Sequence, residues 1–282
     1  MHRRHAGQAA APRPRVSDPP ADDAGLEEAL ARIAEREPEV RAWRALHPPE
    51  ELRARWAEMP AGPLHRVTLG VKDIIDTADL TTERGSPIYA GHRPRADAAC
   101  VALARAGGAL VVGKTVSTEF AYTHPGPTRN PHDPAHTPGG SSSGSAAAVA
   151  AGMARVAFGT QTAGSVIRPG SFCGVPAFKA TFGLVPLTGV HPLAPSFDTL
   201  GWYGRDLDDV AAVLEALAPA AEGAPALPTM PRIGLYRGED WPAAEPATAD
   251  ALAAAAGALR AAGAEVVEVA PAPPLAGLGE AH

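Results

Sequence analysis

The sequence predicts an α/β fold in which a β-sheet is covered by helices on both faces. Short apolar segments with the length of strands alternate with longer segments that have helical periodicity. The 282 residues are 45% hydrophobic and 20% charged, which is enough apolar material to bury a core for one large domain or two small ones. Strands separated by helices in this way are typical of a sheet packed between helical layers.

The predicted elements begin with two outer helices. Leu26, Leu30 and Ile33 share one face of the first helix. A second helix is expected over residues 49–59, because Pro49 suits a first helical turn. Strands are then expected over residues 65–72, 109–112, 156–160, 232–236 and 264–269. Helices are expected between them over residues 97–105, 145–153, 207–217 and 247–262.

The two ends of the chain and one internal segment have compositions that differ from the rest. We expect residues 1–24 to form a disordered tail, because they are rich in Arg, Pro, Ala and Asp. The folded domain is expected over 25–282, with an Ala- and Pro-rich surface linker at 218–231. No apolar run approaches the length of a membrane span, so the sequence predicts a cytoplasmic protein without membrane contact.

Charge and cysteine content restrict the partners and the compartment. The net charge of −6 comes from 31 acidic and 25 basic residues that are interspersed, so no nucleic-acid-binding surface is predicted. We expect a small-molecule or peptide-like partner. Cys100 and Cys173 are the two cysteines, too few for a disulfide framework. They are predicted to be small core residues in a reducing compartment.

Three glycine-rich segments place one lysine and two serines where hydrolytic chemistry can be assembled. The segments are GVKD at 70–73, GGSSSGS at 139–145 and TAGS at 162–165. A serine nucleophile needs a base within hydrogen-bond distance and backbone donors for the oxyanion. A lysine, a relay serine and a glycine-flanked serine can supply all three.

Two competing motifs fail on their structural context. Residues 108–115 match the phosphate-loop pattern, but the variable positions that should curl around a phosphate are themselves the apolar strand. Residues 140–144 match the nucleophile elbow of α/β-hydrolases, with Ser142 at the centre. An elbow needs a strand running into it, whereas residues 123–138 are rich in Pro and His.

Two further local patterns are interpreted from their neighbours. A flexible Gly/Ser linker would not run directly into a helix such as 146–151, so the helix start at 139–145 indicates an anion or oxyanion neighbourhood. His132 and His136 could suggest metal ligands, but Pro134 prevents the helical spacing. We interpret that segment as a loop without a metal.

One family explains the three glycine-rich segments together. The chain resembles the amidase signature family over roughly residues 68–206, which implies a mixed β-sheet core. The resemblance rests on the following segments: 70–73, 113–115, 119–121, 137–152, 159–165, 172–175 and 178–179.

The resemblance implies a Lys-Ser-Ser set of catalytic residues. Ser165 would be the nucleophile, Lys72 the ultimate base and Ser141 the relay that carries the proton between them. The relay serine of the family is the first after the Gly-Gly pair, which selects Ser141 rather than Ser142, and it is associated with a cis peptide. Water would hydrolyse the acyl-enzyme on Ser165, and no metal or cofactor would be required.

Two conditions follow for this chemistry. The oxyanion would be held by main-chain N–H groups of the segment Thr162, Ala163, Gly164 and Ser165. Lys72 has to be neutral to accept a proton, although a free lysine has a pKa of about 10.4. We expect burial in the apolar strand to lower the pKa of Lys72.

Arg168 is the candidate substrate-binding residue. It lies three positions after Ser165 and would project on the same side of a helix that begins there. Arg168 could clamp a carboxylate of the substrate, or it could pair with a carboxylate of the scaffold. The sequence leaves both interpretations open.

The chain departs from the family pattern at a few positions and in length. Ala163 stands where many relatives have Gly, and Ala180 where Pro is usual, but neither change removes a catalytic atom. Family members are usually longer, so we expect a C-terminally truncated amidase. The alternatives are the glutaminase subunit of a tRNA-dependent amidotransferase, or an inactive fragment that acts through association. Homodimer formation is left open.

Overall fold

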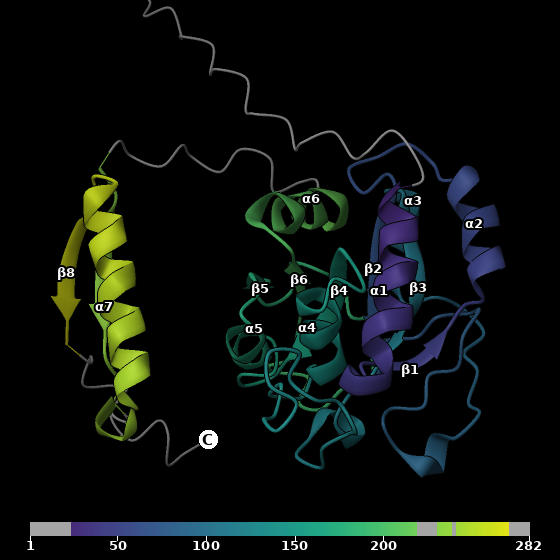
Figure 1. The fold of residues 1–282 in the computed structure, drawn as a ribbon, viewed down its shortest axis with the longest axis horizontal. Helices are drawn as coiled ribbons and strands as arrows, with labels where there is room; N and C mark the ends of the chain where they lie inside the picture. The colour runs from purple at the N-terminus through teal and green to yellow at the C-terminus, as the bar shows by residue number, and fades with distance from the viewer. Residues whose placement is uncertain (1–23, 219–229, 239–240, 271–282) are drawn as a thin grey trace, which may run out of the picture. The chain divides into compact units, whose positions relative to one another are not determined.

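The computed structural model describes residues 24–218, 230–238 and 241–270 (Figure 1). The predicted tail at 1–24 and the predicted linker at 218–231 therefore lie almost wholly outside the described residues. Secondary structure fills most of the remaining chain, and its order follows the predicted alternation of helices and strands.

The chain divides into two compact units between residues 221 and 222. The first unit contains a six-stranded sheet. Its strands are β1 (Trp43–Leu46), β2 (Val67–Lys72), β3 (Ala109–Thr115), β4 (Val156–Gln161), β5 (Ala177–Lys179) and β6 (Thr199–Gly204). The spatial order is β1-β3-β2-β4-β6-β5. β2 runs parallel to β3 and β4, whereas β1, β5 and β6 pair in antiparallel fashion. The sheet is therefore mixed, as the resemblance implied.

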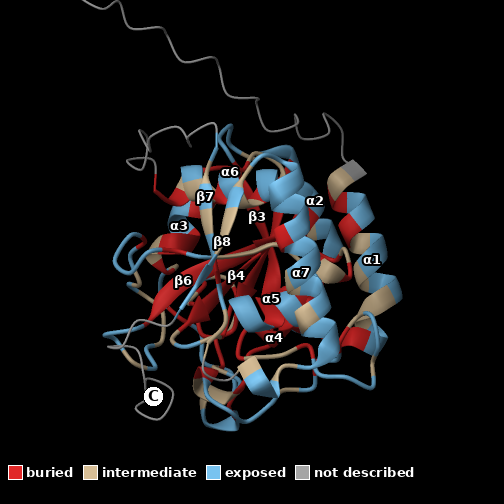
Figure 2. Ribbon diagram, turned by 90° about the vertical axis from the view of Figure 1, so that its left-hand side faces the viewer, coloured by how far each residue is buried: buried red, intermediate tan, exposed pale blue. Residues whose placement is uncertain are grey.

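Helices cover both faces of this sheet, as the sequence predicted. They are α1 (Ala24–Val40), α2 (Pro49–Ala57), α3 (Ala99–Ala106), α4 (Ser143–Ala150), α5 (Ile167–Cys173) and α6 (Leu207–Leu217). α3 and α6 pack into one hydrophobic cluster, and the other four helices pack into a second cluster on the opposite face. The central strands β2, β3, β4 and β6 are buried, and the outer helix surfaces are exposed (Figure 2).

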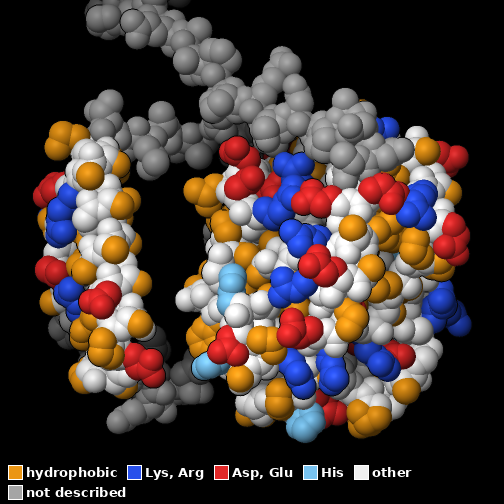
Figure 3. Space-filling model, viewed as in Figure 1, with side chains coloured by type: hydrophobic (Ala, Val, Ile, Leu, Met, Phe, Trp, Pro, Cys, Tyr) orange, Lys and Arg blue, Asp and Glu red, His pale blue; other side chains and the backbone are white. Residues whose placement is uncertain are grey.

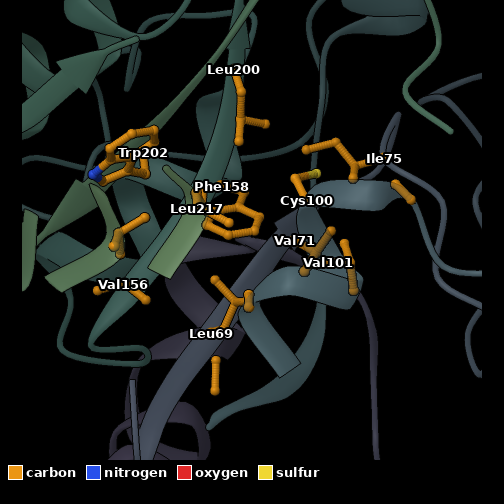
Figure 4. Packing of buried hydrophobic residues seen from close by; sticks show 14 of the residues in the cluster. Leu69, Val71, Ile75, Cys100, Val101, Val156, Phe158, Leu200, Trp202 and Leu217 are labelled. Atoms are coloured by element: carbon orange, nitrogen blue, oxygen red, sulfur yellow. The ribbon is translucent and has the colours of Figure 1, made fainter. Parts of the chain in front are cut away.

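Side chains along each strand point alternately to the two faces of the sheet, so the same strands contribute to both hydrophobic clusters. Leu69 and Val71 of β2 enter the cluster with α3 and α6, whereas Leu110 and Val112 of β3 enter the other. Figure 4 shows Phe158 in the first cluster, among side chains of α3, α6 and the neighbouring strands. Cys100 lies in this cluster and Cys173 in the second, and both are buried free thiols, as predicted.

Small residues allow α4 to lie directly against the sheet. All of its positions from Ser143 to Val149 are buried. A Cβ atom on Gly144 would come within 2.3 Å of the Ala42 carbonyl oxygen and 2.4 Å of the Val116 nitrogen. Only glycine fits this close approach. The glycine- and serine-rich stretch is therefore a packed helix start rather than a linker.

The structure differs from the predicted elements at several places. β3 continues to Thr115 rather than ending at 112, so the glycine and lysine of the phosphate-loop match lie inside a strand. This confirms that the match is accidental. α4 begins at Ser143, two residues before the predicted start. The sequence analysis did not predict β1, β5 and β6, which are short or contain glycine. It placed the start of α5 at Ser165, whereas the helix begins at Ile167.

The second unit holds a strand, a helix and a parallel strand. These are β7 (Arg232–Tyr236), α7 (Pro246–Ala261) and β8 (Glu265–Val269). The strands pair in register from Arg232 opposite Glu265 to Tyr236 opposite Val269. This agrees, within one residue at each end, with the strands predicted at 232–236 and 264–269 and the helix predicted between them.

Charge is distributed as the composition suggested. On the face of the first unit seen in Figure 3, acidic and basic side chains alternate without a large patch of either sign. Among the described residues, no helix is both long and apolar enough to cross a membrane. Within the same residues, no group of three or more His, Cys, Asp or Glu side chains could hold a metal ion.

Candidate active site

Lys72 is the last residue of β2, and its side chain is fully buried. Its Nζ lies 2.7 Å from Ser141 Oγ and 2.9 Å from Thr160 Oγ1. Ser141 precedes α4, and Thr160 belongs to β4, the neighbour of β2. The parallel pairing of β2 with β4 brings Lys72 beside Thr160, and the segment before α4 brings the predicted relay to the predicted base. Thr160, the second partner, was not predicted.

Burial controls the protonation of this lysine. It lowers the pKa of Lys72 to about 7, while the negative charge of Asp198 acts in the opposite direction. A neutral amine has two N–H donors and one lone pair. It can thus donate to Thr160 and accept the Ser141 proton in the observed arrangement. Near neutral pH, a substantial fraction of Lys72 is in this basic form.

Ser141 lies in an unusual backbone setting. The peptide bond between Gly140 and Ser141 is cis, as the resemblance implied. The Ser141 carbonyl accepts a hydrogen bond from Thr118 N at 3.1 Å, and the side chain is almost completely buried. These contacts hold the serine hydroxyl beside Lys72.

The turn between β4 and α5 carries Ser165. Its carbonyl oxygen accepts a hydrogen bond from Ser142 N at 3.3 Å, which joins the turn to the residue next to Ser141. The Ser142 hydroxyl in turn accepts from Thr160 N at 3.2 Å. The two predicted catalytic serines therefore belong to segments that hydrogen-bond to each other.

The same turn presents free backbone donors. Within the part of the chain that the structure describes, the N–H groups of Ala163, Gly164 and Ser165 make no hydrogen bond to another residue. Thr162 is anchored at its side chain, where Oγ1 donates to Asp198 Oδ1 at 2.5 Å. An anchored turn with unused N–H groups is the arrangement that an oxyanion requires.

Gln161 braces this turn, and sequence reasoning did not identify it. Its Oε1 accepts from Val166 N at 2.9 Å and from Ile167 N at 3.0 Å. Its Nε2 donates to Ala163 O at 2.8 Å. The side chain thus fixes the turn on both sides of Ser165. Its position directly before the predicted oxyanion segment was the available signal.

Asp198 is a second brace that sequence reasoning missed. Besides the bond from Thr162, its Oδ2 accepts from Leu193 N at 2.9 Å and from Ala194 N at 3.0 Å. The carboxylate is buried. It therefore links the predicted oxyanion segment to the loop before β6. No local motif marks it, because its partners lie more than thirty positions upstream or in its own loop.

Arg168 lies in the first turn of α5, which begins at Ile167 and not at Ser165 as expected. Its Nη2 and Nε donate to the Gly140 carbonyl at 2.8 and 3.1 Å. The observed scaffold partner is thus a backbone carbonyl rather than a carboxylate. Arg168 also lines an open hollow of about 320 Å³, together with Tyr122 and Phe172.

The residues considered for metal binding lie in a loop, as expected. His132 contacts the Cys173 carbonyl at 2.9 Å through Nε2, and His136 lies 3.0 Å from Asp133.

A second buried lysine, Lys114, donates to the Ile75 carbonyl and the Thr82 hydroxyl. Burial lowers its pKa to about 8, and its contacts tie β3 to the loop after β2.

Comparison with known proteins identifies the family. Residues 24–278 match the model of the protein family described as Amidase, so the chain belongs to this family. It is 38% identical over 276 residues to a glutamyl-tRNA(Gln) amidotransferase subunit of Rhodopirellula baltica, covering 86% of this chain and 55% of that protein. It is 42% identical over 175 residues to Amidase 1 of Oryza sativa subsp. japonica, covering 59% of this chain and 40% of that protein.

Solved structures agree with this assignment. The native peptide amidase of Stenotrophomonas maltophilia matches with a TM-score of 0.74 and 36% identity, over 87% of this chain and 58% of that one. A 6-aminohexanoate cyclic dimer hydrolase matches with a TM-score of 0.78 and 29% identity, over 88% and 57%. The chain spans about half the length of the curated relatives it matches.

Proposed function

We propose that this chain is an amidase that hydrolyses a carboxamide, a non-peptide C–N bond, to a carboxylic acid and ammonia or an amine. The observation that carries the proposal is the buried contact of 2.7 Å between Lys72 Nζ and Ser141 Oγ. A buried lysine with a lowered pKa can act as a general base, and a serine beside it can relay a proton. The relatives with printed amidase names support the same reaction.

The proposed reaction proceeds through an acyl-enzyme. Neutral Lys72 takes the Ser141 proton as Ser141 takes the proton of Ser165, and Ser165 Oγ attacks the amide carbonyl carbon. The N–H groups of the turn 163–165 stabilise the oxyanion. The C–N bond breaks as the proton returns to the leaving nitrogen. Water then attacks the ester, giving the acid and free Ser165.

A serine-directed fluorophosphonate tests the assignment of the nucleophile. We expect one adduct on the purified 282-residue chain, located at Ser165 by intact mass and peptide mapping, and none on Ser165→Ala. A soluble, folded chain that gives no adduct would contradict the proposed function and favour an inactive fragment.

Arg168 is proposed to clamp a carboxylate of the substrate. It is exposed at the rim of the open hollow, and its Nη1 makes no hydrogen bond to another described residue. We expect Arg168→Ala to lower kcat/KM at least about tenfold more for a carboxylate-bearing amide than for its neutral analogue, since a charge-assisted pair is lost only with the former. Equal losses would show that Arg168 only supports the Gly140 carbonyl.

A second candidate is the glutaminase subunit of a tRNA-dependent amidotransferase. The 38% identity to one subunit of a glutamyl-tRNA(Gln) amidotransferase favours it. Glutaminase activity that depends on co-purifying subunits would establish this role. An active chain that purifies alone would exclude it, and light scattering on that chain would decide between a monomer and a homodimer.

We also propose a reducing compartment such as the cytoplasm, which the buried free thiols of Cys100 and Cys173 support.

A further inference from the structure

A second and more enclosed hollow, of about 210 Å³, adjoins the end of β4 and the turn that follows it. Thr160, which contacts Lys72, and Thr162, the first residue of the predicted oxyanion segment, both line it. The proposed reaction steps use neither its volume nor its other walls. The hollow therefore lies against the turn that carries Ser165, although Ser165 itself is not among its lining residues.

The remaining walls of this hollow are mostly apolar. They come from the side chains of Ile74, Ala121, Leu187, Val190 and Leu193. Apolar walls favour a substituent that leaves water without losing hydrogen bonds.

The polar groups of the hollow do not offer a site for a charged ligand. Asp198 Oδ1 accepts from Thr162, and Oδ2 accepts from two main-chain N–H groups. Burial, and then the positive charge of Arg84, lower the pKa of His191. Its ring is therefore neutral near pH 7. Among the described residues that line the hollow, none is Lys or Arg.

We propose that this hollow is the acyl subsite of the amidase and that it selects compact, uncharged apolar acyl groups, such as a branched aliphatic chain or a single aromatic ring. The inference rests on the proposed function. The volume of the hollow supports this upper limit on the size of the acyl group, because an apolar cavity of about 150 Å³ is known to accommodate benzene. A carboxylate on the acyl group would be desolvated beside Asp198 without a compensating cation.

The direction of the amide follows from the order of the reaction steps. The acyl group stays bonded to Ser165 while the amine departs and water enters. An enclosed hollow suits the group that stays, and the more open hollow at Arg168 suits the group that leaves. A carboxylate held by Arg168 therefore belongs to the leaving side of the amide.

Four primary amides test the acyl subsite on the 282-residue chain: acetamide, isovaleramide, phenylacetamide and malonamate. We expect kcat/KM for isovaleramide and phenylacetamide to exceed that for acetamide at least about tenfold, because filling an apolar pocket by even one methylene has effects of this size. Malonamate should be hydrolysed more slowly than acetamide. Equal rates for all four amides, or a preference for malonamate, would overturn the proposal.

Two substitutions at Leu193 move the selectivity in opposite directions. Leu193 is 39% exposed, so it tolerates a change of size. Leu193→Trp should reduce the ratio of phenylacetamide to acetamide to about threefold or less, while Leu193→Ala should raise the rate for the larger naphthylacetamide relative to phenylacetamide. The matched control is Leu184→Trp, at a residue 37% exposed and outside the hollow, which should leave the ratio unchanged.

Fluorophosphonate labelling distinguishes a failure of the acyl subsite from a failure of the proposed amidase function. A chain that is labelled at Ser165 but shows no apolar preference, or a preference that no Leu193 variant alters, refutes the acyl subsite and leaves the proposed amidase standing. A chain that is not labelled refutes the proposed function, and the acyl subsite with it.

Discussion

At the scale of single residues, the site depends on a lysine that folding keeps partly neutral. An ordinary lysine is charged at neutral pH, but Lys72 has lost its water and has two hydroxyl groups as partners. Asp198 limits the lowering of the Lys72 pKa, because its negative charge favours the ammonium form. The pKa of about 7 is the balance of these two influences.

The pH dependence of labelling reports this balance. Since the proposed relay requires the basic form of Lys72, the rate of fluorophosphonate labelling should rise about tenfold per pH unit below pH 7 and level off above it. Asp198→Asn removes the charge that raises the pKa, so the midpoint should move to lower pH. A rate that does not change between pH 5 and 9 would exclude Lys72 as the base.

The lowered pKa of Lys72 also makes the stability of the fold depend on pH. Between pH 7 and the unfolded pKa near 10.5, unfolded Lys72 binds a proton that the folded form does not. The free energy of unfolding should therefore rise with pH across this window. Lys72→Met should abolish that rise and increase stability at pH 7, as measured by urea unfolding. A Lys72→Met chain with the wild-type pH dependence would contradict this explanation.

Gln161 should be a positioning residue for Ser165, the proposed nucleophile. Gln161→Leu removes three hydrogen bonds to the turn, so we expect labelling of Ser165 to slow by about 10- to 100-fold. Gln161→Glu keeps an acceptor for Val166 N and Ile167 N but loses the donor to Ala163 O, and it should give an intermediate rate. Identical labelling of wild-type and Gln161→Leu chains would show that the brace is dispensable.

At the scale of elements, sequence patterns predicted those segments whose own composition decides their structure. The runs at β2, β4, α6 and β7 have clear periodicity or apolar character, and the structure confirms them. β6 could not be predicted because tertiary packing stabilises it, and α5 was expected only as a helix starting at Ser165, without an end. β6 contains two glycines and is buried between β4 and β5, and α5 contains Pro169 and Gly170.

The close packing of α4 can be tested with one methyl group. Gly144→Ala would place its Cβ within 2.4 Å of backbone atoms, so we expect it to destabilise the chain by about 1–3 kcal/mol and to slow labelling. Gly257→Ala in α7 is the matched control, because nothing lies within 4 Å of its new Cβ. It should stabilise that helix by about 0.5–1 kcal/mol. Equal thermal midpoints for the two variants would argue against the packing explanation.

At the scale of the whole molecule, three residues proposed as catalytic could be selected from the sequence, whereas the side chains that brace their segments could not. The sequence placed Lys72, Ser141 and Ser165 in three separate glycine-rich segments, and the sheet and its turns bring those segments together. Asp198 could not be predicted, because its hydrogen bonds form only when the turn and the loop before β6 meet. Gln161 was missed although it directly precedes the predicted oxyanion segment, because its role lies in hydrogen bonds to the folded turn.

The most direct test of the central claim compares three chains in one labelling experiment. Wild-type, Lys72→Met and Ser141→Ala chains are treated with a fluorophosphonate, and the rate of adduct formation at Ser165 is measured by intact mass. We predict rapid labelling of the wild type and a loss of at least about 100-fold in each variant, since both remove the proton path from Ser165. Labelling of all three chains at the same rate would contradict the proposed Lys72–Ser141 relay.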